Sequence, residues 1–219
     1  MNVFDILGPV MIGPSSSHTA GAARIGRITR TLLGVPAVKA DILLHGSFAK
    51  TYKGHGTDKA LIAGIMGMAT DDVRIRQAPE LAKEAGLEVH ISTGDIDGAH
   101  PNTAKVTLTD ANGRQVSLLG SSIGGGNILV TEVNGMEVSL TGQYTTLIVL
   151  HKDAPGTIAA VTEVMAEEGI NICNFRLSRQ KKGGEAVMTI ELDGKPSPEI
   201  NKKINTLPNI YSSTMLQPI

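Results

Sequence analysis

The chain of 219 residues contains one cysteine, Cys173, and no tryptophan, and its aromatic residues amount to only 3%. A single cysteine excludes an internal disulfide. It also excludes an iron–sulfur cluster held by this chain alone, because such clusters typically need about four thiolates. Cys173 lies among apolar neighbours in Gly169–Phe175, and we expect it to be a small buried strand residue, as free cysteines usually are. The core must be aliphatic, since hydrophobic residues make up 41% of the chain.

The chain also has no marked excess of positive or negative charge, and it has no long apolar run. Its formal net charge is −1, and it has no basic tract and few aromatics to stack on bases, which argues against nucleic-acid binding. No apolar run approaches the roughly 18 residues of a membrane span. The opening segment, residues 1–13, lacks the basic start and the cleavage site of a signal peptide. We therefore expect a cytoplasmic protein that binds neither nucleic acid nor membrane.

Hydroxyl side chains surround an imidazole in the segment Gly13–Thr19, which has the sequence GPSSSHT. A helical spacing of apolar residues follows, at Ala22, Ile25, Ile28 and Leu32, and Gly34 is expected to end that helix. We expect the polar residues to lie on the loop that enters the helix, where free backbone N–H groups favour an anion such as a carboxylate. The alternative is an ordinary serine cap beside a surface histidine.

A second histidine, His55, lies at the end of the segment Ser47–Gly56, which we expect to be a polar loop. The glycines on both sides of His55 would allow the backbone to approach a ligand closely. Thr57 or Asp58 is expected to cap the helix that follows. The alternative is a surface turn with an incidental histidine.

From Thr103 onward the first two thirds of the chain shows strand patterns, with a strong hairpin signal at Asn134-Gly135. Strands that follow helices predict an α+β fold. Ser121–Asn127 is glycine-rich but precedes a strand and lacks the ending of a phosphate-binding P-loop. His100–Thr103 is expected to be a turn that orders the domain or lines a subunit interface.

The residue pattern in the last third of the chain predicts a separate unit of about 75 residues. Its order of elements, βαββαβ, is that of a ferredoxin-like fold. Its expected helices and strands run from Tyr144 to Leu216. We place the domain boundary at Gly142-Gln143, so that residues 1–142 form a mixed α/β domain and residues 143–219 form the ferredoxin-like domain.

Several of these motifs resemble one family. The run GPSSSHTAGAARIGR at residues 13–27 resembles the signature of iron–sulfur-dependent L-serine dehydratases, and the whole chain resembles the β subunit of their two-subunit bacterial form. KGHGTDKA at residues 53–60, HPNT and SIGGG match the same family's pattern. The last third resembles an ACT domain through its DxPGxIxxVxxxMxxxGINI run.

The resemblance implies an L-serine ammonia-lyase that forms pyruvate and ammonia. It implies a 4Fe-4S cluster held by a partner α subunit, whose open iron acts as a Lewis acid on the substrate hydroxyl, and no pyridoxal phosphate. It also implies that this chain alone binds no cluster and is inactive. The catalytic residues it implies are His55, as a base, and His18. The implied substrate-binding residues are Ser15, Ser16, Ser17, Thr19 and Thr57. The SIGGG segment is expected to approach the active cleft.

For the ACT domain, the resemblance implies edge-to-edge self-association and a regulatory ligand at Asp153 and Asn171. Asp153 replaces the asparagine found in some amino-acid-binding relatives, so a purely structural pairing domain is the alternative. A second hypothesis for the whole chain is a regulatory, amino-acid-sensing subunit without catalytic residues. The two histidine-bearing segments favour the enzyme, because a pure sensor needs no paired imidazoles.

Overall fold

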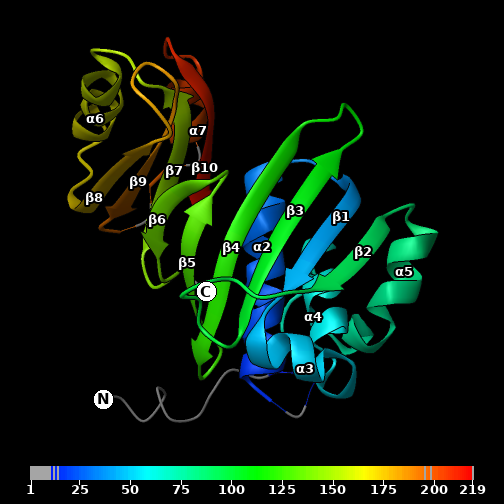
Figure 1. Ribbon diagram of the computed structural model, residues 1–219. Coiled ribbons are helices and arrows are strands. Elements are labelled where there is room, and N and C mark those ends of the chain that lie inside the picture. The colour runs from blue at the N-terminus through cyan, green and yellow to red at the C-terminus, as the bar shows by residue number, and fades with distance from the viewer. Residues whose placement is uncertain (1–10, 12, 14, 195, 198, 219) are drawn as a thin grey trace. The chain divides into compact units, whose positions relative to one another are not determined.

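The chain forms two compact units, Met1–Asn134 and Gly135–Ile219 (Figure 1). The computed structural model describes residues 11, 13, 15–194, 196–197 and 199–218. The predicted α+β class is confirmed. The domain boundary predicted at Gly142-Gln143 stays a prediction.

The first unit alternates helices and strands up to residue 93 and continues with strands alone. In chain order its elements are η1 (Ser17–Gly21), α2 (Ala22–Leu33), β1 (Ala37–Leu44), α3 (Gly46–His55), α4 (Thr57–Ile65), η2 (Val73–Gln77), α5 (Ala78–Glu84), β2 (Glu88–Thr93), β3 (Thr103–Asp110), β4 (Gln115–Gly124) and β5 (Asn127–Val133). Gly34 ends α2 in a left-handed conformation, as predicted.

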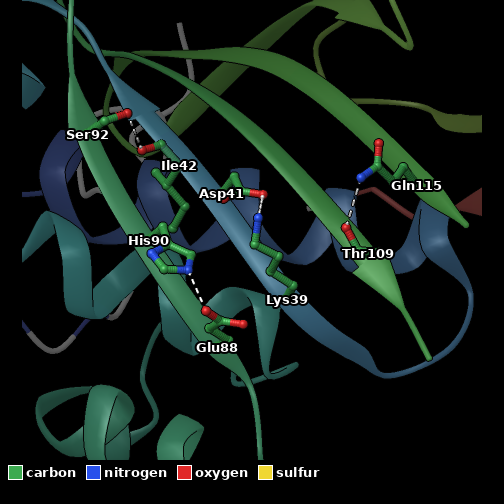
Figure 2. A network of polar contacts seen from close by, with 8 residues as sticks. All are labelled: Lys39, Asp41, Ile42, Glu88, His90, Ser92, Thr109 and Gln115. Carbon is green, nitrogen blue, oxygen red and sulfur yellow. Dashed lines mark hydrogen bonds and ion pairs between the residues drawn. The ribbon is translucent and has the colours of Figure 1, made fainter. Parts of the chain in front are cut away.

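The sheet of this unit has the order β2-β1-β3-β4-β5, in which β1 and β2 are parallel and the other neighbours are antiparallel. Alternate residues of β1, β3 and β4 are buried, and α2 lies across this buried face (Figure 1). The opposite face is polar. Figure 2 shows it from close by, with Lys39 bonded to Asp41 and His90 bonded to Glu88. The core therefore lies between the sheet and the helices that carry the candidate site.

Helices α2 and α4 pack with their backbones in contact. A β-carbon added to Gly26 would collide with the carbonyl oxygen of Leu61 and would lie 2.9 Å from the nitrogen of Ile65. A β-carbon on Gly64 would collide with the carbonyl oxygen of Ala23. Both positions therefore require glycine, because any side chain would force the two helices apart.

One segment differs from its prediction. Residues 47–56 were expected to form a polar loop, but all except Gly56 belong to helix α3. Phe48 is fully buried and holds this helix on the unit. Gly56, with φ of 72°, ends α3 and directly precedes α4, so Gly56 occupies the N-cap position expected for Thr57 or Asp58. The glycine-flanked histidine is thus the last residue of a helix.

The second unit confirms the ferredoxin-like plan. After β6 (Met136–Leu140) it runs β7 (Thr145–Lys152), α6 (Thr157–Glu167), β8 (Ile172–Arg179), β9 (Glu185–Leu192), α7 (Glu199–Asn205) and β10 (Ile210–Leu216). The strand order is β10-β7-β9-β8, with all pairs antiparallel. An aliphatic cluster from the central strands β7 and β9 and from both helices fills its core.

The expectation of a buried Cys173 is wrong. The side chain is exposed on β8, at the edge of the sheet, where the pairing with β9 shifts register between Ile172 and Asn174. The register shift breaks the alternation that would have turned Cys173 inward.

We predict that Gly26→Ala and Gly64→Ala each lower the free energy of unfolding by about 1–3 kcal/mol, because overpacking must separate α2 from α4. Urea unfolding of the full chain measures this effect. The matched control is Gly54→Ala in α3, where a β-carbon meets no atom within 4 Å. Stability of the control should be unchanged or raised by up to about 1 kcal/mol. Equal stability of Gly26→Ala and the control would contradict the proposed backbone contact.

Candidate active site

The first predicted motif is built into a helix. Ser17, His18 and Thr19 belong to η1, a π-helical turn that continues directly into α2. Among the described residues, the expected position before the helix holds for Gly13, Ser15 and Ser16. His18 and Thr19 are 7% and 2% exposed, so the alternative of a surface histidine is wrong.

The structure brings the two predicted histidines together, although 37 residues separate them in sequence. The ring centroids of His18 and His55 are 4.7 Å apart, and the rings are nearly perpendicular, at 83°. Phe48 of α3 contacts the His18 ring edge-on, with a centroid distance of 5.2 Å. His55 is exposed, whereas His18 is enclosed. The pair therefore combines one accessible imidazole with one held inside the unit.

Burial lowers the pKa of His18 below its ordinary value of 6.5, and the neighbouring His55 lowers that pKa further. Burial acts by penalising the charged ring, and His55 acts by repulsion when it is protonated. His18 is therefore held in its neutral form beside the exposed His55.

Three hydroxyl groups surround the His18 ring. Ser15 Oγ lies 3.2 Å from Nδ1, Thr51 Oγ1 lies 3.1 Å from Nε2, and Ser47 Oγ lies 3.5 Å from Nε2. Sequence reasoning missed Ser47 and Thr51, because it assigned their segment to a loop. Ser47, Thr51 and His55 follow one another at intervals of four residues, and this spacing is the signal that would have placed them on one face of a helix.

A pocket of about 410 Å³ opens beside His55. It is lined by Gly13, Thr19, Lys53, Gly54, His55, Gly56, Lys59, Ile75 and Arg76. Two lysines and an arginine make it suitable for a small carboxylate. These three cations come from α3, α4 and η2, and none of them was predicted as a site residue.

Several buried hydroxyls near the site lack a hydrogen-bond partner among the described residues: Thr19, Thr57 and Ser122. An unmade bond of this kind costs about 1–3 kcal/mol. Thr19 lines the pocket, but its hydroxyl oxygen is buried beneath the pocket surface. Thr57 is fully buried and does not line the pocket, and Ser16 and Ser17 are not among the lining residues either.

The two remaining family motifs, HPNT and SIGGG, contact the helical elements that carry the site. Pro101, in the HPNT segment, accepts a hydrogen bond from the backbone N–H of Ser47 at 2.7 Å. Ser122, in the SIGGG segment, lies so close to Gly21 of η1 that a β-carbon on that glycine would collide with it. The N–H of Ser122 also donates to the carbonyl of Asn102 at 2.9 Å, which joins the two motifs.

In the second unit, the two predicted regulatory residues have separate partners. Asp153 accepts hydrogen bonds from the backbone N–H of Gly183 at 2.9 Å and from Arg179 at 2.7 Å, and both interactions lower its pKa. It lines a pocket of about 530 Å³. Asn171 donates to Asp193 at 2.7 Å and is not among the residues that line this pocket.

Within the described ranges, no group of three or more histidine, cysteine or carboxylate side chains could hold a metal ion. The same residues include no helix both long enough and apolar enough to cross a membrane.

These features define a class of protein: an α+β chain whose first unit has a paired-imidazole site and whose second unit is ferredoxin-like. Comparison with known proteins specifies the class. The serine dehydratase beta chain family profile matches residues 2–96, and the ACT domain profile matches residues 145–209.

The chain is 46% identical over 215 residues to the probable L-serine dehydratase, beta chain, of Bacillus subtilis, covering 98% of this chain and 97% of that protein. It is 38% identical to the L-serine dehydratase, beta chain, of Peptoniphilus asaccharolyticus, covering 90% and 89%. The chain belongs to the L-serine dehydratase beta chain family. It is also 28% identical to a D-3-phosphoglycerate dehydrogenase of Methanocaldococcus jannaschii, over 91% of this chain but only 37% of that protein.

We predict that acidification destabilises the protein partly through His18. An unfolded chain takes up this proton near pH 6.5, whereas the folded chain takes it up only at a lower pH. The stabilisation is therefore complete above pH 6.5 and is lost as the pH falls toward the folded-state pKa. Urea unfolding at several pH values should show a smaller loss for His18→Asn than for the wild type. His90→Asn, at an exposed position on β2, is the control. An identical pH dependence for wild type and His18→Asn would contradict the assignment.

Proposed function

We propose that this chain supplies part of the active site of an L-serine dehydratase, which converts L-serine to pyruvate and ammonia together with an α subunit. The observation that carries the proposal is the contact between a buried, neutral His18 and an exposed His55 at a cation-lined pocket. Membership of the beta chain family supports it.

In this proposal the three cations Lys53, Lys59 and Arg76 hold the substrate carboxylate. Thr19 contributes to the wall of the same pocket. His55 accepts the α-proton, because a neutral imidazole is a suitable base near pH 7 and its ring is accessible. His18 packs against His55 and stays neutral, so it holds the base in place without competing for the proton.

The 4Fe-4S cluster belongs to the α subunit in this proposal. The residues of this chain do not fit a cluster, because its one cysteine, Cys173, lies in the second unit and not at the site. The described residues contain no other set of metal-ligating side chains. No step is therefore assigned to the cluster here, and the reaction is proposed to proceed without pyridoxal phosphate.

A regulatory subunit without catalytic residues is the second candidate. One observation favours it: a region similar to 91% of this chain forms only 37% of a protein named as a D-3-phosphoglycerate dehydrogenase. The same two domains thus accompany a different named activity, as expected for a regulatory module. In this case the pocket at Asp153 would hold the regulatory ligand, and His55 would be dispensable.

We predict that serine-dependent pyruvate formation and cluster absorbance require co-expression with the α subunit and are absent from this chain alone. In the assembled complex, His55→Ala should lower kcat roughly 10²- to 10⁴-fold, as expected for loss of a general base. His90→Ala, on the polar sheet face, is the matched control and should keep the wild-type kcat (Figure 2). A wild-type kcat for His55→Ala in an intact complex would remove the catalytic role and favour the regulatory candidate.

Self-association through the ACT domain is the second part of the proposal. β8 lies at the edge of its four-stranded sheet and exposes Leu177, which is 40% accessible. An unpaired edge is a template for another strand, and a second copy of this chain would cover it.

We predict that Leu177→Lys lowers the mass of the isolated full chain in solution to that of a single copy, because a charge at the edge opposes strand pairing. Light scattering measures the mass. Val73→Lys, at a 72% exposed position in the first unit, is the control and should keep the wild-type mass. Equal masses for wild type and Leu177→Lys, with both above one copy, would assign the association to another surface.

A further inference from the structure

The hydroxyl of Thr51 has two neighbours with different chemistry. Its oxygen lies 2.8 Å from the carbonyl oxygen of Ser47 and 3.1 Å from Nε2 of His18. The threonine lies on α3, one turn after Ser47 and one turn before His55. It therefore links the helix that carries the exposed imidazole to the buried one.

The geometry determines which atom donates. A hydroxyl has one hydrogen, and a carbonyl oxygen can only accept. The hydrogen of Thr51 is thus used by the Ser47 carbonyl, and the oxygen presents a lone pair to His18. A contact of 3.1 Å with this lone pair requires a hydrogen on Nε2.

The opposite side of the ring agrees with this assignment. A neutral imidazole with its hydrogen on Nε2 has an accepting lone pair on Nδ1. Ser15 Oγ lies 3.2 Å from Nδ1 and also accepts the backbone N–H of His18, at 3.4 Å. The hydroxyl hydrogen of Ser15 is therefore left free to point at Nδ1.

We infer that Thr51 is a positioning residue, which keeps the proton of neutral His18 on Nε2 and so orients the hydroxyl of Ser15 toward Nδ1. Burial of His18 makes the neutral ring the relevant form. The consequence for catalysis rests on the proposed function. Both ring nitrogens of His18 are used in hydrogen bonds to Thr51 and Ser15, so His55 is the imidazole that exchanges a proton with substrate.

The test is the protonation site of His18 in the full chain labelled with ¹⁵N-histidine. Long-range ¹H–¹⁵N spectra at neutral pH distinguish a protonated from an unprotonated ring nitrogen, and His18→Asn identifies the signals. We expect the wild type to carry the proton on Nε2. Thr51→Val, which keeps the shape but loses the acceptor, should give a mixture of tautomers or the Nδ1 form. Thr51→Ser should restore the wild-type spectrum.

The control is Ser47→Ala, which removes a hydroxyl 3.5 Å from Nε2 but keeps the backbone carbonyl that orients Thr51. Its tautomer should be that of the wild type. A wild-type proton on Nδ1, or an unchanged tautomer in Thr51→Val, overturns the inference. If Thr51→Val does not fold, the wild-type and Thr51→Ser spectra still decide, because either one with the proton on Nδ1 is contrary to it.

Measurements of kcat, taken together with the spectra, distinguish a failure of this inference from a failure of the proposed function. In the assembled complex Thr51→Val should lower kcat roughly 10- to 100-fold, as loss of a hydrogen bond in a buried network does, and Thr51→Ser should recover it. An altered tautomer with a wild-type kcat would overturn the catalytic consequence. A wild-type complex that forms no pyruvate would refute the proposed function, whereas the spectra would still test the role of Thr51.

Discussion

The backbone contact between α2 and α4 is the constraint on which the candidate site depends. η1 continues into α2 and carries His18, while the junction of α3 and α4 carries His55. His18 precedes Gly26 of α2 along η1 and α2, and His55 directly precedes α4, which carries Gly64. Because neither glycine has a side chain, the helices approach closely enough for the two rings to touch. A wider separation would leave the imidazoles apart and His18 open to water.

The electrostatics of the pair follow from this packing. His18 loses hydration by burial, which lowers its pKa, whereas His55 is exposed and lines the pocket. Cations from three separate elements line the same pocket and would hold an anion beside His55.

The two units of the chain carry different chemical groups. The first unit holds the imidazoles, the cations and the unpartnered hydroxyls, and the second has an open sheet edge and a pocket at Asp153. With one cysteine, neither unit has the thiolates for a cluster. Under the proposed function, a second kind of chain would supply the cluster.

The sequence by itself determined the features that depend on local rules. The helices and strands from β7 to β10 follow the predicted βαββαβ order, and Asn134 and Gly135 have the positive φ that their dipeptide predicts. The two histidine motifs were also identified from sequence. Turn chemistry and apolar alternation act over a few residues, and therefore they can be recognised without a partner element.

Tertiary structure alone decided how the site is assembled. α3 was mistaken for a loop because its few apolar residues, among them the buried Phe48, give a weak helical pattern, and its stability comes from packing against the rest of the unit. Thr51 and Arg76 acquire their roles only through neighbours distant in sequence. Cys173 was placed on the wrong face because a register shift with β9 cannot be seen in β8 alone. Local sequence specifies which residues can form a helix or strand, but contacts between elements determine which side chains meet.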